Sequence, residues 1–219
     1  KPQSVLRLRF ANLPLRRELV LAIVGVGLSP FVMHLASSVI NLLINRALAS
    51  HGGDTAISAY GIIAAVTMLM LMPIFGINQG AQPIIGYNYG ANQHGRVKSA
   101  LRLAVLAATV VSVLGFAATE VFASPMIRSF ADSPGLEGVG SRGLRIYLLL
   151  LPALGAQIVV INYFQSIGKA KVSLLLSLMR QVLVLIPLVL FLPRVWGLDG
   201  VWASAPISDT VSCLVTAAA

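Results

Sequence analysis

The side chains best placed to support chemistry in this sequence are polar groups that lie inside long apolar segments. Asp209 is the one acid well inside such a segment, and His34, Ser38 and Asn41 are spaced so that they share one face of a helix. An ionisable group at that depth in a membrane costs about 2.5–3.5 kcal/mol on insertion scales, so it is first examined as a functional group. These side chains are suited to binding a polar ligand, a proton or a small cation.

The composition shows why these segments are expected to lie in a membrane. Hydrophobic residues make up 57% of the 219 residues and charged residues 11%, against roughly 45–50% and about 25% in ordinary globular chains. A soluble domain with so few charges could not cover its surface. The chain is therefore predicted to be an integral membrane protein.

The apolar segments predict six membrane spans, each long enough to cross about 30 Å of hydrocarbon. They cover residues 19–43, 57–85, 97–122, 144–167, 172–192 and 200–219. The fold class that follows is an all-α, six-transmembrane-helix antiparallel bundle. Residues 1–17 form a basic connecting segment, and residues 18–219 form the transmembrane lobe.

The distribution of Lys and Arg predicts the orientation in the membrane. The segment before the first span and the loops after the second and fourth spans carry ten Lys and Arg residues, whereas the opposite loops carry five. Cytoplasmic loops are enriched in these residues. We therefore expect a multi-pass protein of the inner cell membrane with both ends of this segment in the cytoplasm. The same rule explains the net charge of +9 without a nucleic-acid partner.

The polar groups inside the spans have two interpretations. The stripe of His34, Ser38 and Asn41 can line a cavity, or it can form hydrogen bonds between helices. Gln157 and Asn162 in the fourth span raise the same question. Asp209 can serve a functional site, or it can be a buried partner for Arg180 or for amides. Arg180 lies early in its span, where a long side chain can also reach the cytoplasmic interface.

Catalysis finds no support in the sequence. The three histidines are far apart and have no acids at metal-ligand spacing. No nucleophile–base–acid set or phosphate-binding loop can be assembled. The single Cys213 lies in an apolar segment and offers neither a disulfide nor a metal cluster. We expect a protein that is not an enzyme and that uses no metal or cofactor.

A polar stretch between the second and third spans carries a recognisable pattern. It reads Pro73-x-x-Gly-x-x-Gln-Gly-x-Gln-Pro-Ile-Ile-Gly-Tyr-Asn-Tyr-Gly-Ala, and it resembles the corresponding connection in the MATE (multidrug and toxic compound extrusion) transporters. Segments 163–187 and 197–209 resemble the tenth-to-eleventh-helix region and the last helix of that family. The structural signature of the resemblance comprises Pro73, Gln79, Gln82, Pro83, Gly86, Gly90 and Arg180. The glycines and Pro83 are expected to shape a turn and to let backbones approach closely. Gln79 and Gln82 are expected to tie that turn to neighbouring helices.

The resemblance implies the carboxy-terminal half of a twelve-helix transporter built from two six-helix lobes. We therefore expect a piece of a longer polypeptide, whose partner is the amino-terminal lobe and whose surroundings are membrane lipids. Such transporters export drug-like, often cationic compounds in exchange for H⁺ or Na⁺ by alternating access. In some branches, carboxylates on the seventh and tenth helices bind the cation. Apart from the terminal Glu18, the first and fourth spans here contain no Asp or Glu, which argues against coupling at those positions.

Three functional hypotheses remain open from the sequence. The leading one is a lobe of a multidrug antiporter. A flippase for lipid-linked oligosaccharides would favour a cavity with several cationic residues, and Arg180 alone qualifies. A membrane subunit with no transport of its own is the third. The candidate cavity residues are His34, Ser38, Asn41, Gln157, Asn162 and Asp209.

Overall fold

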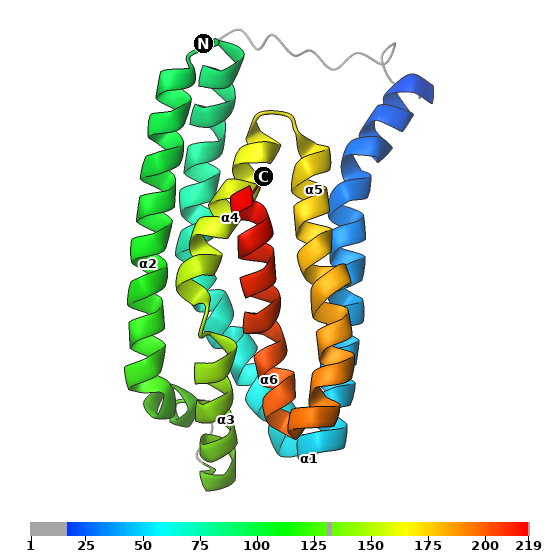
Figure 1. Ribbon diagram of the computed structural model, residues 1–219, viewed down its shortest axis with the longest axis vertical. Helices are drawn as coiled ribbons and strands as arrows, with labels where there is room; N and C mark the ends of the chain where they lie inside the picture. Colours follow the sequence, from blue (N-terminus) through cyan, green and yellow to red (C-terminus); the bar gives the residue numbers. More distant parts are fainter. Residues whose placement is uncertain (1–16, 131–132, 219) are drawn as a thin grey trace, which may run out of the picture.

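A computed structural model of the chain describes residues 17–130 and 133–218, which fold almost entirely into helices (Figure 1). The predicted connecting segment, residues 1–17, lies outside the described residues except for Arg17, which begins the first helix. The helices in chain order are α1 (Arg17–Gly90), α2 (His94–Arg128), α3 (Pro134–Tyr147), α4 (Leu151–Ser166), α5 (Ala170–Leu178), the π-helix η2 (Met179–Leu185) and α6 (Ile186–Ala218). The all-α class predicted from the sequence is confirmed.

The 74 residues of α1 form two antiparallel halves joined at Gly53. A straight helix of this length would extend about 110 Å, far beyond a hydrocarbon core of about 30 Å. Gly53 has φ 62° and ψ −159°, a backbone conformation that is essentially restricted to glycine. Across this bend the Tyr60 hydroxyl donates to Asn41 Oδ1 at 3.3 Å. The bend falls within the loop expected between the first two spans.

A second glycine makes the last two spans antiparallel. Gly197 lies inside α6 with φ 57° and ψ −134°. Beyond it the chain runs back along η2, as shown by the Ser208 hydroxyl, which donates to the Arg180 carbonyl at 2.9 Å. The fifth predicted span therefore corresponds to α5, η2 and the first part of α6, and the sixth to the remainder of α6.

The fourth span is a bent pair of helices, α3 and α4, which meet at 49°. Pro152 occupies the first turn of α4, where its missing N–H leaves no helical hydrogen bond unmade. The predicted third and fourth spans leave residues 123–143 between them as a connection, and this expectation is wrong for most of that stretch. α2 continues to Arg128 and α3 already begins at Pro134, so the connection is far shorter than expected.

With the bends at Gly53 and Gly197, and with α3 and α4 counted as one bent span, the described part of the chain forms six membrane-spanning segments. Over residues 17–130 and 133–218, three helices are long and apolar enough to cross a membrane, or four when α3 and α4 count as one bent span. Two of these runs double back, at Gly53 and Gly197. The result is the predicted six-helix antiparallel bundle, visible as neighbouring up and down segments in Figure 1.

The main core gathers apolar side chains from α1, α3, α4 and α6. Its largest buried members include Leu48, Ile63, Leu144, Leu151 and Trp202. The Trp202 indole is 1% exposed and stacks on Tyr60 with ring centroids 6.3 Å apart. The outer face of the bundle is apolar as well, which suits a lobe surrounded by lipid, where burial between helices depends on close packing rather than on escape from water.

The glycine- and proline-rich signature segment is helical, which corrects one expectation. Pro73, Pro83 and Gly86 all lie inside α1, which ends only at Gly90. The turn that follows is made by residues 91–93, where Asn92 has φ 56°. Pro83 and Gly86 therefore do not shape that turn, which begins directly after Gly90. Gly86 agrees with the expected close approach of backbones, because a Cβ there would lie 3.3 Å from the Ser166 carbonyl oxygen at the end of α4.

Candidate functional site

A cavity of about 190 Å³ lies between both halves of α1, the end of α3 and the π-helix η2. Two apolar positions of the first half of α1 and one of η2 form part of its wall. Its polar lining comes from Ser37, Asn41, Tyr60, Tyr147, Arg180 and Gln181. Such a mixture of aromatic walls and a few converging polar groups is typical of small-molecule sites. This cavity is the candidate substrate site of the lobe.

The two tyrosines and the α1 polar groups hold one wall of this cavity together. The Tyr60 and Tyr147 rings meet edge to face with centroids 6.1 Å apart, an arrangement that aromatic pairs favour. Tyr60 also donates to Asn41 Oδ1. One turn before Asn41 on the same helix, the Ser37 hydroxyl donates to Gln181 Oε1 at 3.4 Å. The cavity therefore lies where the first half of α1 meets η2.

Arg180 is positioned by the π-helix and by an ion pair with α6. Its Nε lies 2.6 Å from Asp209 Oδ1, and its carbonyl accepts the Ser208 hydroxyl. π-helical turns are rare and occur often at functional sites. The turn here ends two residues before Pro187, whose ring has no N–H for a regular helical bond. The expected approach of Arg180 to the cytoplasmic interface is replaced by this internal pairing.

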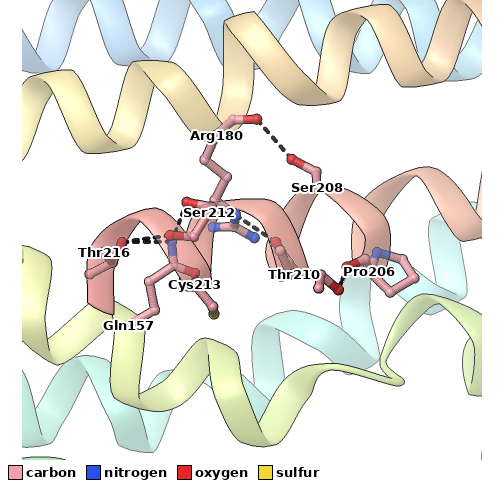
Figure 2. A network of polar contacts seen from close by, with 9 residues as sticks. Gln157, Arg180, Pro206, Ser208, Thr210, Ser212, Cys213 and Thr216 are labelled. Carbon is pink, nitrogen blue, oxygen red and sulfur yellow. Dashed lines mark hydrogen bonds and ion pairs between the residues drawn. The ribbon is translucent and has the colours of Figure 1, made fainter. Parts of the chain in front are cut away.

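A second polar network joins α4 to α6 near that ion pair, and Figure 2 shows its members. The Gln157 side chain is 3% exposed. Its amide nitrogen donates to the Ser212 hydroxyl and, at 3.5 Å, to the Thr216 hydroxyl. The Cys213 thiol donates to Gln157 Oε1 at 3.4 Å. This pattern satisfies a buried amide between two helices, which is a structural arrangement.

The structure separates the candidate residues that the sequence grouped together. Asn41 lines the cavity. His34 and Ser38 lie on the same exposed side of α1, where Ser38 donates to the His34 carbonyl at 3.0 Å. Asn162 is half-buried and donates to the Ile158 carbonyl of its own helix at 3.0 Å.

Gln157 and Asp209 were expected to line a cavity, and the structure shows instead that both are buried between helices. Asp209 is 6% exposed and Gln157 is 3% exposed, and both are engaged by side chains of neighbouring helices. The physical reason is that a charged or amide group inside a low-dielectric bundle is stabilised by partners from the next helix. Of the two interpretations of Asp209, the structure supports the buried partner for Arg180.

The signature glutamines are also placed differently from the expectation. Gln79 and Gln82 are exposed on α1, and within the described ranges neither makes a hydrogen bond to another helix. The buried amides of this segment are Asn78 and Asn88, whose side chains donate to carbonyls one turn earlier, at Ile74 and Ile84. The spacing of four residues behind each asparagine explains this local bonding.

Four residues of the cavity lining were not singled out from the sequence: Ser37, Tyr60, Tyr147 and Gln181. Tyr60 and Tyr147 stand in apolar stretches, where a single-sequence pattern cannot distinguish a cavity residue from a core residue. Ser37 lies four residues before the candidate Asn41 and therefore on the same helix face. This spacing could have identified Ser37 from the sequence. Gln181 is adjacent to Arg180, and the π-helix decides which way it faces.

The opposite end of the bundle is fastened by three ion pairs. Arg128 Nε lies 2.8 Å from Glu137, Arg142 lies 2.5 Å from Asp199, and Arg145 lies 4.0 Å from Glu120. They link α3 to α2 and to α6. A shallow cavity of about 250 Å³ adjoins the Arg142–Asp199 pair, with Trp196 and Trp202 in its wall. Exposed ion pairs contribute little individually, so this end is interpreted as structural.

Comparison with known proteins places these features in a family context. The family model described as MatE matches residues 30–191. The multidrug export protein MepA of Staphylococcus aureus (strain bovine RF122 / ET3-1) is 24% identical over 198 residues, which are 90% of this chain and 43% of MepA. MepA of Staphylococcus saprophyticus is 24% identical over 200 residues, again 90% of this chain and 43% of that protein. The chain spans about half the length of the curated relatives it matches.

This chain also matches about half of the length of solved transporter structures. The MATE multidrug transporter DinF-BH is 36% identical with a TM-score of 0.83, covering 99% of this chain and 48% of that one. An inward-facing multidrug resistance MATE family transporter is 22% identical with a TM-score of 0.84, covering 99% and 50%. The fold of the present chain is therefore similar to about half of each of these structures.

Proposed function

Because this chain belongs to the MATE family, we propose that it forms the carboxy-terminal lobe of an exporter for drug-like compounds. The transport would proceed by alternating access, in exchange for H⁺ or Na⁺. The observation that carries this proposal is the cavity between α1 and η2, which combines the Tyr60 and Tyr147 rings with hydrogen-bonding groups. Aromatic walls accept flat apolar molecules of many shapes, and a few polar groups fix their orientation.

The partner of this lobe is proposed to be the other half of the same transporter. The coverage of about half of each relative supports that arrangement. An exposed polar stripe on the first half of α1, including His34 and Ser38, would be costly against lipid. We propose that the stripe faces the aqueous space between the two lobes, continuous with Asn41 in the cavity.

The coupling ion is proposed to act outside the cavity of this lobe. Within the described part of the chain, the residues that line this cavity include no carboxylate. Asp209, which lies behind the lining, is engaged by Arg180. A carboxylate that exchanges H⁺ or Na⁺ needs access to water during the cycle, so the other lobe is the better place for it. The orientation is proposed to be that of the charge bias, in the inner membrane with both ends of this segment in the cytoplasm.

Efflux of a fluorescent cationic dye from bacteria that lack their own multidrug pumps tests the proposal. Cells that express the complete protein should retain less dye than cells with the empty vector. Asn41→Leu and Tyr60→Leu should raise retention, because they remove polar contacts from the cavity wall. Asn162→Leu is the matched control, since its amide bonds to its own helix. Equal dye retention with and without the protein would overturn the proposal.

A further inference from the structure

The cavity between α1 and η2 has an electrostatic polarity that the family alone does not specify. Among the described residues, Arg180 is the one charged group in its lining. Its counter-ion Asp209 comes from α6 and does not line the cavity. The Arg180 side chain is 28% exposed and that of Asp209 is 8% exposed. A ligand in the cavity therefore meets the positive end of the pair.

The guanidinium of Arg180, a residue of the cavity lining, has N–H donors that its ion pair leaves unused. A guanidinium carries five N–H donors, and the ion pair with Asp209 uses Nε. Within residues 17–130 and 133–218, its terminal amino groups have no protein acceptor. Two parallel N–H donors at the end of an arginine match the two oxygens of a carboxylate. The Asp209 contact holds the stem in place and leaves that end of the fork available.

The neighbouring polar groups of the lining are bonded to one another. The Tyr60 hydroxyl donates to Asn41 Oδ1, the Asn41 amide donates to the Ser37 carbonyl at 3.0 Å, and Gln181 Oε1 accepts from the Ser37 hydroxyl. A wholly cationic ligand gains no ion pair here, because the described lining includes no acid. The lobe is thus better matched to a ligand that presents an acidic group on this side.

We propose that Arg180 recognises a carboxylate on the exported compound, so that this lobe selects zwitterionic or anionic amphiphiles. The inference rests on the proposed function and specifies its substrate class. Asp209 acts as a positioning residue, because it orients the guanidinium without contacting the ligand. The cationic part of a zwitterion would then lie toward the other lobe.

A matched pair of dyes tests this proposal. Rhodamine 6G carries an ethyl ester on its phenyl ring, and its hydrolysis product carries a free carboxylate on the same ring system. The affinity of each dye for the purified complete protein in detergent is measured by fluorescence polarisation, and the readout is the ratio of the two dissociation constants. A general loss of structure would weaken both dyes together and leave this ratio unchanged.

Three variants give distinct expected ratios. Arg180→Gln combined with Asp209→Asn removes the cation without leaving a buried charge unpaired, and it should reduce the preference for the acid about tenfold, which corresponds to about 1.4 kcal/mol. Asp209→Asn alone removes the carboxylate that orients the guanidinium, and it should reduce that preference by less than the double variant does, because the cation remains. Arg194→Gln, which removes an equal charge from an exposed arginine beside Phe191, should leave it unchanged.

The outcomes separate this inference from the proposed function. A ratio that stays within twofold of the wild-type value in the double variant would overturn the recognition role, and so would a wild-type protein that binds neither dye. If the ratios shift as expected but the complete protein moves no dye across a membrane, the inference on Arg180 stands and the proposed export fails.

Discussion

Two buried polar residues of this bundle, Asp209 and Gln157, are held by partners on neighbouring helices, and the Arg180–Asp209 pair is the stronger instance. Removing one member of a buried pair leaves the other charge uncompensated and costs about 3–5 kcal/mol, whereas replacing both with apolar residues costs far less. Asp209→Ala should therefore lower the thermal unfolding temperature in detergent more than Arg180→Met combined with Asp209→Leu. Equal losses in the two proteins would contradict this account of the pair.

Gln157 provides a second test at the same scale. Its amide contacts Ser212, Cys213 and Thr216 on α6, and hydrogen bonds between membrane helices contribute about 0.6 kcal/mol on average and up to about 1.7. Gln157→Leu should cost about this much in the free energy of unfolding. Asn162→Leu on the same helix should cost less, because its amide contacts only its own backbone. A larger loss in the Asn162 variant would overturn this assignment.

The sequence identified which buried polar positions are unusual, but it did not identify the role of each one. The sequence marked Asp209 and Gln157 as unusual because of their depth in apolar segments, and both are engaged in networks. It could not decide between a cavity and a partner helix, because that choice depends on which helices are neighbours. Tyr60 and Tyr147 escaped notice because aromatic residues in apolar segments are ordinary.

Helix packing depends on one very close approach, between α2 and α4 at Gly155. A Cβ at this position would lie 1.9 Å from the Ser112 hydroxyl oxygen and 3.0 Å from the Ala108 carbonyl oxygen. Gly155→Ala should therefore destabilise the lobe by about 1–3 kcal/mol, the usual range for overpacking.

Two companion variants control this prediction. Ser112→Gly should restore part of the loss, because it removes the nearest clashing atom. Gly61→Ala, where a Cβ would meet nothing within 4 Å, should be neutral or stabilising, since alanine favours helices over glycine by about 1 kcal/mol. Thermal unfolding in detergent measures all three, and an equal loss in the Gly61 and Gly155 variants would refute the close-contact explanation.

Elements were predicted well where hydrophobicity alone decides them and poorly where the backbone departs from a regular helix. The predicted spans 19–43 and 57–85 require a connection between them, and the bend of α1 at Gly53 lies in that interval. The break between α3 and α4 and the π-helix η2 lie beside Pro152 and Pro187. These prolines indicate that each helix is disturbed there, but they do not give the form of the disturbance, which depends on packing against other helices. The signature segment was expected to form a turn, since its glycines and prolines are typical of turns in soluble proteins, whereas membrane helices tolerate them.

The molecule as a whole is one six-helix lobe of a family whose members matched here are about twice as long. Its architecture followed from the spacing of apolar segments, because only helices of this length satisfy their backbone groups in a bilayer. Its transport role does not follow from the lobe alone. Within the described residues, the cavity lining contains one cation and no acid, so the proposed ion coupling would need groups outside this cavity.

Gradient-driven transport by the complete protein tests the central claim most directly. Purified protein is reconstituted into proteoliposomes, an inward or outward gradient of H⁺ or Na⁺ is imposed, and the movement of rhodamine 6G is followed by fluorescence. The account predicts dye accumulation against its own gradient under at least one ion gradient, abolished when an ionophore collapses that gradient. Dye movement that is the same with and without either gradient would contradict it.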